Sequence, residues 1–288
     1  MDTQLHSKQT ASLAIPQSAP QAWKFQSAQA AAESKQILDK YAPISLAEME
    51  AVALLKRVDT KYVLHIQQLF QALSSLRDRY RVLEVQGYRL NRYRNLYFDT
   101  TDFRLYHQHH NGLRNRYKVR SREYVDSQLS YLEVKRKNNR DRTIKSRLQT
   151  RGFVSDLSQK GGAFLAEKYP YEHQRLQPVL WNDFMRITLV SKNAVERLTL
   201  DINLQISKGW EQIGFPGLAV AEVKQDRFSI HSDFMQQMRA VKVQPQRFSK
   251  YCLGIALFYP QVKNNRFKPR IMLIERIMRQ GADHGYHH

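Results

Sequence analysis

Two strands joined by a turn are expected in residues 131–148, YLEVKRKNNRDRTIKSRL. Side chains two positions apart point to the same face of a strand, so Glu133 and Lys135 share one face of the first strand. Leu132 and Val134 lie on its other face. This arrangement raises the question of which face is buried, and of what could balance the charges if the charged face were inside.

The same alternation recurs along the chain, with mostly lysine and arginine on one face of each predicted strand. The shared faces hold Asp59 and Lys61; Lys118, Arg120 and Arg122; Glu133 and Lys135; Lys145 and Arg147; Arg197, Thr199 and Asp201; and Glu222 and Lys224. A half-exposed antiparallel sheet with a solvated outer face explains any single strand of this kind. The basic bias across all six instead favours a barrel whose charged face lines a tunnel. The residue pattern alone leaves both arrangements open.

Basic residues are in large excess over the whole chain, with 46 Lys and Arg against 26 Asp and Glu and a formal net charge of +20. Two like charges about 4 Å apart repel by roughly 4 kcal/mol at an effective dielectric constant of about 20. A cationic interior therefore needs anions, and a chain of phosphates suits it because Arg and Lys bind phosphate well. The few carboxylates would then be ligands for Mg²⁺ or Mn²⁺, which take oxygen donors from protein and phosphates together.

The 288 residues divide into three segments. Residues 1–42 are rich in Ala, Gln and Ser and predict a disordered tail. Residues 43–260 form the predicted domain, which begins with a capping-box pattern from Ser45 to Glu48 ahead of a short helix. About eight strands with helices at intervals predict an α+β fold, an antiparallel eight-stranded β-barrel flanked by helices. Residues 261–288 predict a basic amphipathic helix or tail.

The apolar stretches, the cysteine and the histidines of the sequence further limit the class of protein. No stretch of roughly 18 apolar residues is present and no signal peptide is evident, so a cytoplasmic location is expected. The single cysteine, Cys252, lies in an apolar run and is expected to pack in the core. The histidines of HQHH, residues 107–110, lack regular zinc-ligand spacing and are not assigned to a metal.

Eight short motifs, in this order, resemble the polyphosphate polymerase domain of the vacuolar transporter chaperone (VTC) family, which belongs to the triphosphate tunnel metalloenzymes (CYTH-like superfamily). The motifs are RVDTKY, LYFDTTDFRLYH, KVRSREY, YLEVKRK, TIKSRL, RLTLD, AVAEVK and RFSKYCLG. The resemblance extends over residues 43–260. It implies an eight-stranded antiparallel tunnel in which the γ-phosphate of ATP is transferred to a growing polyphosphate chain with a divalent metal, Mn²⁺ or Mg²⁺.

The resemblance also implies roles for individual residues. Those implied to be catalytic are Lys61, Arg120, Arg122, Lys135, Arg186 and Lys250, and those implied to bind phosphate are Lys118, Lys145, Arg147, Arg197 and Lys224. Glu222 and Glu133 are the implied metal ligands. Asp59 and Asp201 are the implied accessory carboxylates, and Asp59 stands where relatives commonly carry a glutamate. The implied partners are ATP, inorganic polyphosphate or triphosphate, and a separate membrane protein.

Three functions remain open on this basis. A polymerase uses the polyphosphate end as phosphate acceptor, a triphosphatase uses water, and a binding module does no chemistry. A nucleic-acid interface is less favoured. YRLNRYRNLYF interleaves aromatic residues with arginines, as stacking surfaces can, but this pattern is more typical of a strand whose tyrosines pack beneath a helix.

Overall fold

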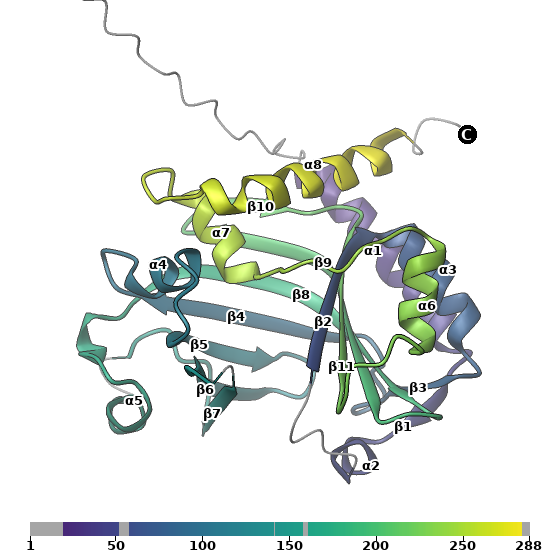
Figure 1. The fold of residues 1–288 in the computed structure, drawn as a ribbon, viewed down its shortest axis with the longest axis horizontal. Helices are drawn as coiled ribbons and strands as arrows, with labels where there is room; N and C mark the ends of the chain where they lie inside the picture. The colour runs from purple at the N-terminus through teal and green to yellow at the C-terminus, as the bar shows by residue number, and fades with distance from the viewer. Residues whose placement is uncertain (1–19, 52–57, 141, 158–160, 284–288) are drawn as a thin grey trace, which may run out of the picture.

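The computed structural model describes residues 20–51, 58–140, 142–157 and 161–283, which form eight α-helices and one sheet of 11 strands (Figure 1). The helices are α1 (Pro20–Leu38), α2 (Leu46–Ala51), α3 (Ile66–Leu76), α4 (Arg104–His110), α5 (Gly162–Lys168), α6 (Asp233–Ala240), α7 (Lys250–Phe258) and α8 (Lys268–Asp283). The strands are β1 (Ala42–Ile44), β2 (Val58–His65), β3 (Tyr80–Leu83), β4 (Asn91–Asp99), β5 (Arg116–Tyr124), β6 (Leu129–Lys137), β7 (Thr143–Thr150), β8 (Gln177–Ser191), β9 (Glu196–Lys208), β10 (Glu211–Gly214) and β11 (Leu218–Gln225).

Eight strands lie side by side in the order β2-β11-β9-β8-β4-β5-β6-β7, each antiparallel to the next. The predicted α+β fold, with an eight-strand antiparallel path and flanking helices, is confirmed. The sheet is not a closed barrel, however, because β2 and β7 at the two ends of this path are not paired with each other in the described part of the chain. β1, β3 and β10 extend the sheet.

The free edge of β2 is covered by the segment that precedes α7. The Gln246 N–H donates a hydrogen bond to the Lys61 carbonyl oxygen at 2.7 Å, and Tyr62 forms an isolated bridge with Pro245. These contacts use backbone groups that closure onto another strand would need. The sheet therefore curves without closing by hydrogen bonds at this edge (Figure 1).

A first core packs α1, α3 and α6 against the outer face of β2, β8, β9 and β11. The prediction of a disordered tail over residues 1–42 is wrong for the part from residue 20, which includes α1. Leu38 is fully buried in this core, and the Asn203 side chain donates to the Ser27 carbonyl oxygen at 2.8 Å. So few large aliphatic residues occur here that the helix was not recognised from composition. Residues 1–19 lie outside the described residues.

A second core covers the other face of the sheet at one end, where α7 and α8 pack on apolar residues such as Val63, Ile206 and Leu218. The prediction for Cys252 is confirmed, because this residue is buried in α7 within the second core. The predicted C-terminal helix is α8, and it docks on the domain through Ile271 and other isoleucines. A third core lies between α5 and the outer face of β4, β5 and β6.

The capping box predicted from Ser45 to Glu48 is present, although ordered structure begins earlier, at α1. The Ser45 N–H donates to a Glu48 carboxylate oxygen at 2.9 Å, and the Glu48 N–H donates to the Ser45 hydroxyl at 3.2 Å. These reciprocal bonds form the capping box that opens α2. Of the helices in the described residues, none combines the length and the hydrophobicity needed to cross a membrane.

Candidate functional site

The charged residues predicted to share a face do lie on one side of the sheet, which we call the charged face. In the strand register, Lys61 is opposite Glu222 and Arg120 is opposite Glu133. The face comprises Asp59 and Lys61 on β2, Glu222 and Lys224 on β11, Arg197 and Asp201 on β9, Arg186 on β8, Lys118, Arg120 and Arg122 on β5, Glu133 and Lys135 on β6, and Lys145 and Arg147 on β7. Lys250, the first residue of α7, joins them through its contact with Asp201.

Asp201 holds the first cluster of charges together. Its side chain is almost completely buried and accepts two hydrogen bonds from Arg186, Nε to Oδ1 at 2.6 Å and Nη2 to Oδ2 at 2.8 Å. The Lys250 ammonium donates to Oδ2 as well. Burial by itself would raise the pKa of Asp201, but the charges of Arg186 and Lys250 outweigh it and lower this pKa below its ordinary value. Asp201 is therefore ionised and orients one arginine and one lysine.

Glu133 holds a second cluster of charges together and, like Asp201, contacts one arginine and one lysine. It is 2% exposed, and its Oε2 accepts from Arg120 Nε at 2.8 Å and Nη2 at 2.7 Å. Lys145 Nζ lies 2.5 Å from Oε1. Burial would raise the pKa of Glu133, but Arg120, Arg122 and Lys145 lower it below its ordinary value. Both carboxylate oxygens are thus occupied by cationic partners.

Glu222 holds the third cluster, between β2 and β9. The Lys61 ammonium donates to Oε1, and Lys224 Nζ lies 2.8 Å from Oε2. Lys224 also donates to the Thr199 hydroxyl at 2.7 Å. Burial lowers the pKa of Lys224 to about 8, although Glu222 opposes this shift. The pKa of Glu222 itself lies well below its ordinary value, because Lys224 and Lys61 outweigh the effect of burial.

Lys135 shows that the two ends of the charged face approach each other. Desolvation by the surrounding protein, and next the charge of Lys118, lower the pKa of Lys135 to about 8. Lys61 acts in the same direction and Glu222 opposes it, although these two residues lie on β2 and β11 at the far end of the strand path. Curvature of the sheet therefore brings β6 within electrostatic range of β2 and β11.

Arg122 and Lys118 are held by neutral partners rather than by carboxylates. Arg122 is buried, its Nε donates to Asn95 Oδ1 at 2.8 Å, and its guanidinium lies 5.2 Å from the Tyr93 ring centroid. Lys118 donates to the Ser249 hydroxyl at 2.8 Å, just before α7. The contacts described for these two cations thus orient them without a carboxylate bound directly to either.

Sequence reasoning missed Tyr97, which lies on the charged face between β8 and β5. Its hydroxyl accepts a hydrogen bond from Arg120 Nη1 at 3.2 Å, and its ring is 5.0 Å from that of Tyr251 on α7. Burial would raise the pKa of Tyr97, but Arg120, Lys118 and Arg122 lower it to about 8. The alternation of Tyr93, Asn95 and Tyr97 could have placed these residues beside the arginines.

The other predicted residues, at the rim of the charged face, are Asp59, Arg197 and Arg147. Asp59 and Arg197 flank Lys224 in the register on either side of β11. Arg147 is exposed on β7, with its guanidinium 5.0 Å from the Tyr131 ring centroid. HQHH lies in α4, where His109 is within electrostatic range of Lys118 and Lys135. There burial lowers the pKa of His109 to about 2, and its Nε2 is 3.1 Å from the Tyr117 carbonyl oxygen.

The side chains available as ligands limit how a metal ion could be held on the charged face. Over the described residues, no three His, Cys, Asp or Glu side chains are grouped to hold a metal ion. Glu133, Asp201 and Glu222 instead each sit between two cations. Mg²⁺ is commonly held by one or two carboxylates while phosphates and water supply the other ligands. The residues present therefore fit a metal that arrives with a phosphate substrate, and Glu222, which is more exposed than Glu133, is the better placed ligand.

Comparison with known proteins agrees with the geometry of the charged face. The sequence matches the family profile of the VTC domain over residues 56–259. This chain belongs to the VTC domain family. The VTC domain thus spans β2 to β11 and includes α7, so every residue of the charged face, and Lys250, falls within it. No protein of curated function matches the chain.

Solved structures match most of this VTC domain protein, but only at low identity. A putative adenylate cyclase from Bacillus halodurans is 14% identical, with a TM-score of 0.46, over 71% of this chain and 97% of that one. A putative adenylyl cyclase from Hippeastrum, described as having a dominant triphosphatase activity, is 13% identical, with a TM-score of 0.41, over 69% and 96%. An RNA triphosphatase from S. pombe is 14% identical, with a TM-score of 0.25, over 73% and 67%.

Proposed function

We propose that this protein is a metal-dependent polyphosphate polymerase, which transfers the γ-phosphate of ATP to a polyphosphate chain on the charged face. One observation carries the proposal. Cations from seven strands and α7 lie on a single face, and three carboxylates hold six of them in fixed positions. Guanidinium and ammonium groups fixed in this way suit a chain of phosphates, because little side-chain entropy is lost when it binds.

The residues of the chain would act by alignment and charge neutralisation. Phosphoryl transfer needs in-line placement of the acceptor and stabilisation of charge on the transferring group, and it needs no protein nucleophile. Arg120 and Arg186, each oriented by a buried carboxylate, would contact the β- and γ-phosphates together with Lys250. Arg122, Lys118 and Lys135 would hold the chain or its acceptor end. Lys145, Arg147, Arg197 and Lys224 would extend this grip along the face.

A divalent cation, Mn²⁺ or Mg²⁺, would be held by Glu222 together with substrate phosphates. When bound, it would supply positive charge that neutralises the phosphates. Glu133 would serve to position Arg120 and Lys145, because its side chain is 2% exposed, against 19% for Glu222, and is therefore less accessible to a metal. Asp201 would position Arg186 and Lys250 in the same way, and Asp59 would lie beside Lys224 at the rim.

The reaction is tested by incubating the purified protein with ATP and Mn²⁺ or Mg²⁺ and separating the products on a gel stained for polyphosphate. A ladder of chains with release of ADP is the expected result. ADP and free phosphate without chains would overturn the polymerase proposal in favour of a triphosphatase. Tight polyphosphate binding without turnover of any triphosphate would indicate a binding module.

Glu222→Gln tests the metal assignment. We expect this variant to lose metal-dependent turnover while it binds tripolyphosphate in metal-free buffer at least as tightly as the wild type, because Lys61 and Lys224 are freed from their counter-charge. Glu211→Gln, an exposed carboxylate on β10, is the matched control and should remain fully active. A Glu222→Gln variant with unchanged turnover and metal dependence would contradict the assignment.

A triphosphatase is the second candidate, and one observation favours it. The second core covers one end of the charged face, where α7 and α8 pack against Val63, Leu218 and Ile206. A chain longer than a few phosphates could then leave only towards the other end. A short substrate such as inorganic triphosphate or a nucleoside triphosphate has no such requirement.

A further inference from the structure

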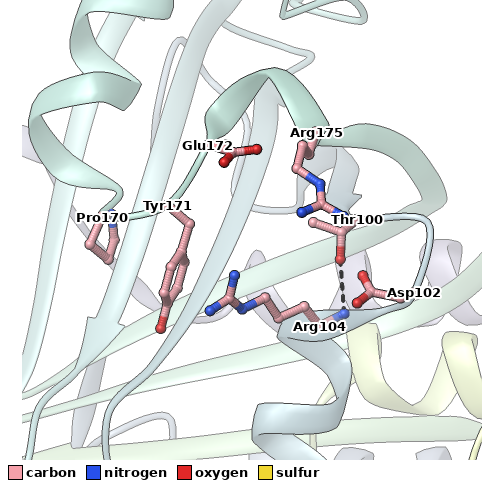
Figure 2. Close-up of a pocket in the computed structure, with 7 residues that line it drawn as sticks. All are labelled: Thr100, Asp102, Arg104, Pro170, Tyr171, Glu172 and Arg175. Carbon is pink, nitrogen blue, oxygen red and sulfur yellow. Dashed lines mark hydrogen bonds between the residues drawn. The ribbon is translucent and has the colours of Figure 1, made fainter.

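A pocket, called below the second pocket to set it apart from the charged face, lies between the turn after β4 and the segment that joins α5 to β8. Its volume is about 270 Å³. The residues that line it are Thr100, Asp102, Arg104, Pro170, Tyr171, Glu172 and Arg175 (Figure 2). None of them belongs to the charged face. Tyr171 packs against the third core, on the outer side of the sheet, so the pocket and the charged face are on opposite sides of β4.

Two guanidinium groups reach this pocket from different segments of the chain. Arg104 at the start of α4 lies over the Tyr171 ring, with Cζ 3.7 Å from the ring centroid. Arg175 comes from the short 3-10 helix His173–Arg175 and projects towards Thr100 (Figure 2). Stacking of a guanidinium on an aromatic ring fixes its plane. The pocket therefore offers one rigid and one adjustable group of the kind that binds phosphate through paired hydrogen bonds.

Two carboxylates share the pocket with these arginines. A hydrogen bond from Thr100 and the charges of Arg175 and Arg104 lower the pKa of Asp102, so this carboxylate is ionised at neutral pH. Glu172 lies on the other wall (Figure 2). Ionised carboxylates accept hydrogen bonds from hydroxyl groups and repel a polyanion. The pocket is therefore unlike the charged face, where cations outnumber carboxylates.

A buried hydroxyl beside the pocket has no partner in the described structure. Tyr169 directly precedes Pro170 and is 2% exposed, yet its hydroxyl makes no hydrogen bond within the described residues. Its ring is 5.3 Å from that of Tyr171, and Asp99 and Arg104 are close enough to affect its pKa, which burial raises. Buried hydroxyls are normally satisfied. Tyr169 does not itself line the pocket, however, and packs in the third core next to the lining residues Pro170 and Tyr171.

We propose that this pocket binds a small phosphomonoester that carries hydroxyl groups, the chemistry shared by sugar phosphates and nucleoside monophosphates. Arg104 and Arg175 would hold the phosphate, and Asp102 and Glu172 would accept hydrogen bonds from the hydroxyl groups. The volume is just below the range of roughly 300–1,000 Å³ usual for ligand pockets, which suits one ring with one phosphate. The same carboxylates would exclude inorganic polyphosphate from this site.

The test is isothermal titration of the full chain in metal-free buffer with saturating tripolyphosphate, which occupies the charged face and leaves the second pocket free. Ribose 5-phosphate and adenosine monophosphate are the two titrants, and they separate the two sources of the ligand. Orthophosphate and ribose are the controls. We expect saturable binding of at least one phosphomonoester, and weaker or no binding of both controls.

Arg175→Gln should weaken that binding by about tenfold, the loss expected for one charge-assisted hydrogen bond. Arg279→Gln removes an exposed charge on α8 and should leave binding unchanged. Because Arg175 is exposed, its variant should fold, and the melting temperature checks this. Absence of binding by both phosphomonoesters would overturn the proposal, as would equal affinity in Arg175→Gln. Orthophosphate binding as tight as that of the esters would also overturn it. None of these measurements depends on ATP turnover, so failure here is distinct from failure of the proposed function.

Discussion

Asp201→Asn is the substitution that most directly tests how the charged face is stabilised. The wild-type carboxylate is almost fully buried and compensates both Arg186 and Lys250. Asparagine has nearly the same shape, so it leaves no cavity. It removes the only negative charge that contacts these two cations in the described residues. The variant therefore isolates the electrostatic contribution from packing.

The expected cost follows from the burial of this cluster. Removing one partner of a buried ion pair costs about 3–5 kcal/mol, because the remaining charge is left uncompensated. One kcal/mol shifts the melting temperature by about 2–4 °C for a domain of roughly 150–250 residues. We therefore expect Asp201→Asn to lower the melting temperature by about 6–20 °C. Bound anion should restore stability by about 2.7 kcal/mol at a concentration near 100 times its Kd.

The assay is thermal and urea unfolding of both proteins at neutral pH, with and without tripolyphosphate in metal-free buffer. Tripolyphosphate should raise the melting temperature of Asp201→Asn more than that of the wild type, because it replaces the missing counter-charge. Glu211→Gln, in an exposed pair with Lys208 at 3.7 Å, is the control and should change stability by less than about 1 kcal/mol. A variant as stable as the wild type, or one that gains no more than the wild type from tripolyphosphate, would refute this reasoning.

Three further outcomes are expected. The pKa of Lys224 is about 8 in the folded protein and about 10.4 in the unfolded chain. Between these two pH values the unfolded chain binds one more proton at this residue than the folded protein does. The free energy of unfolding should therefore increase with pH in this window. Tripolyphosphate affinity should fall over the same window, and titrations of wild type and Lys224→Met at several pH values would show a smaller fall in the variant. Leu38→Ala should cost about 2–5 kcal/mol in urea unfolding, whereas a free N-terminal tail would give no change. Gly254→Ala should cost about 1–3 kcal/mol, because the added Cβ would lie 2.2 Å from Leu180 Cδ2; unchanged stability would show that α7 can shift.

The fold was predictable where the signal was local. Alternation of charged and apolar residues grouped the charged residues of β2, β5, β6, β7, β9 and β11 on shared strand faces, and the capping box marked the start of α2. Helix α1 was missed because its stability comes from docking, with Leu38 and Ile37 packed against a distant core. The open edge at β2 was missed too, because it depends on the Gln246 contact with Lys61 across a large sequence separation.

The candidate site was predictable to a similar extent. The two-residue alternation of side chains along a strand was enough to group Glu133 with Lys135 and Glu222 with Lys224. It did not reveal that Glu133 contacts Arg120 and Lys145 on the two neighbouring strands, because lateral neighbours depend on strand order and register. Tyr97 could not be identified from the sequence for a related reason, because its hydroxyl joins the site through a hydrogen bond with Arg120 on the neighbouring strand β5.

The sequence by itself determined that a strongly basic chain would place its charges on one face of an antiparallel sheet, because side-chain direction in a strand depends only on a two-residue period. The motifs also determined the family. Tertiary structure alone decided that Glu133, Asp201 and Glu222 would each hold two cations, that α7 and α8 would cover one end of the charged face, and that Arg104 and Arg175 would line the same pocket. These features depend on contacts between segments far apart in the chain, which no local pattern encodes.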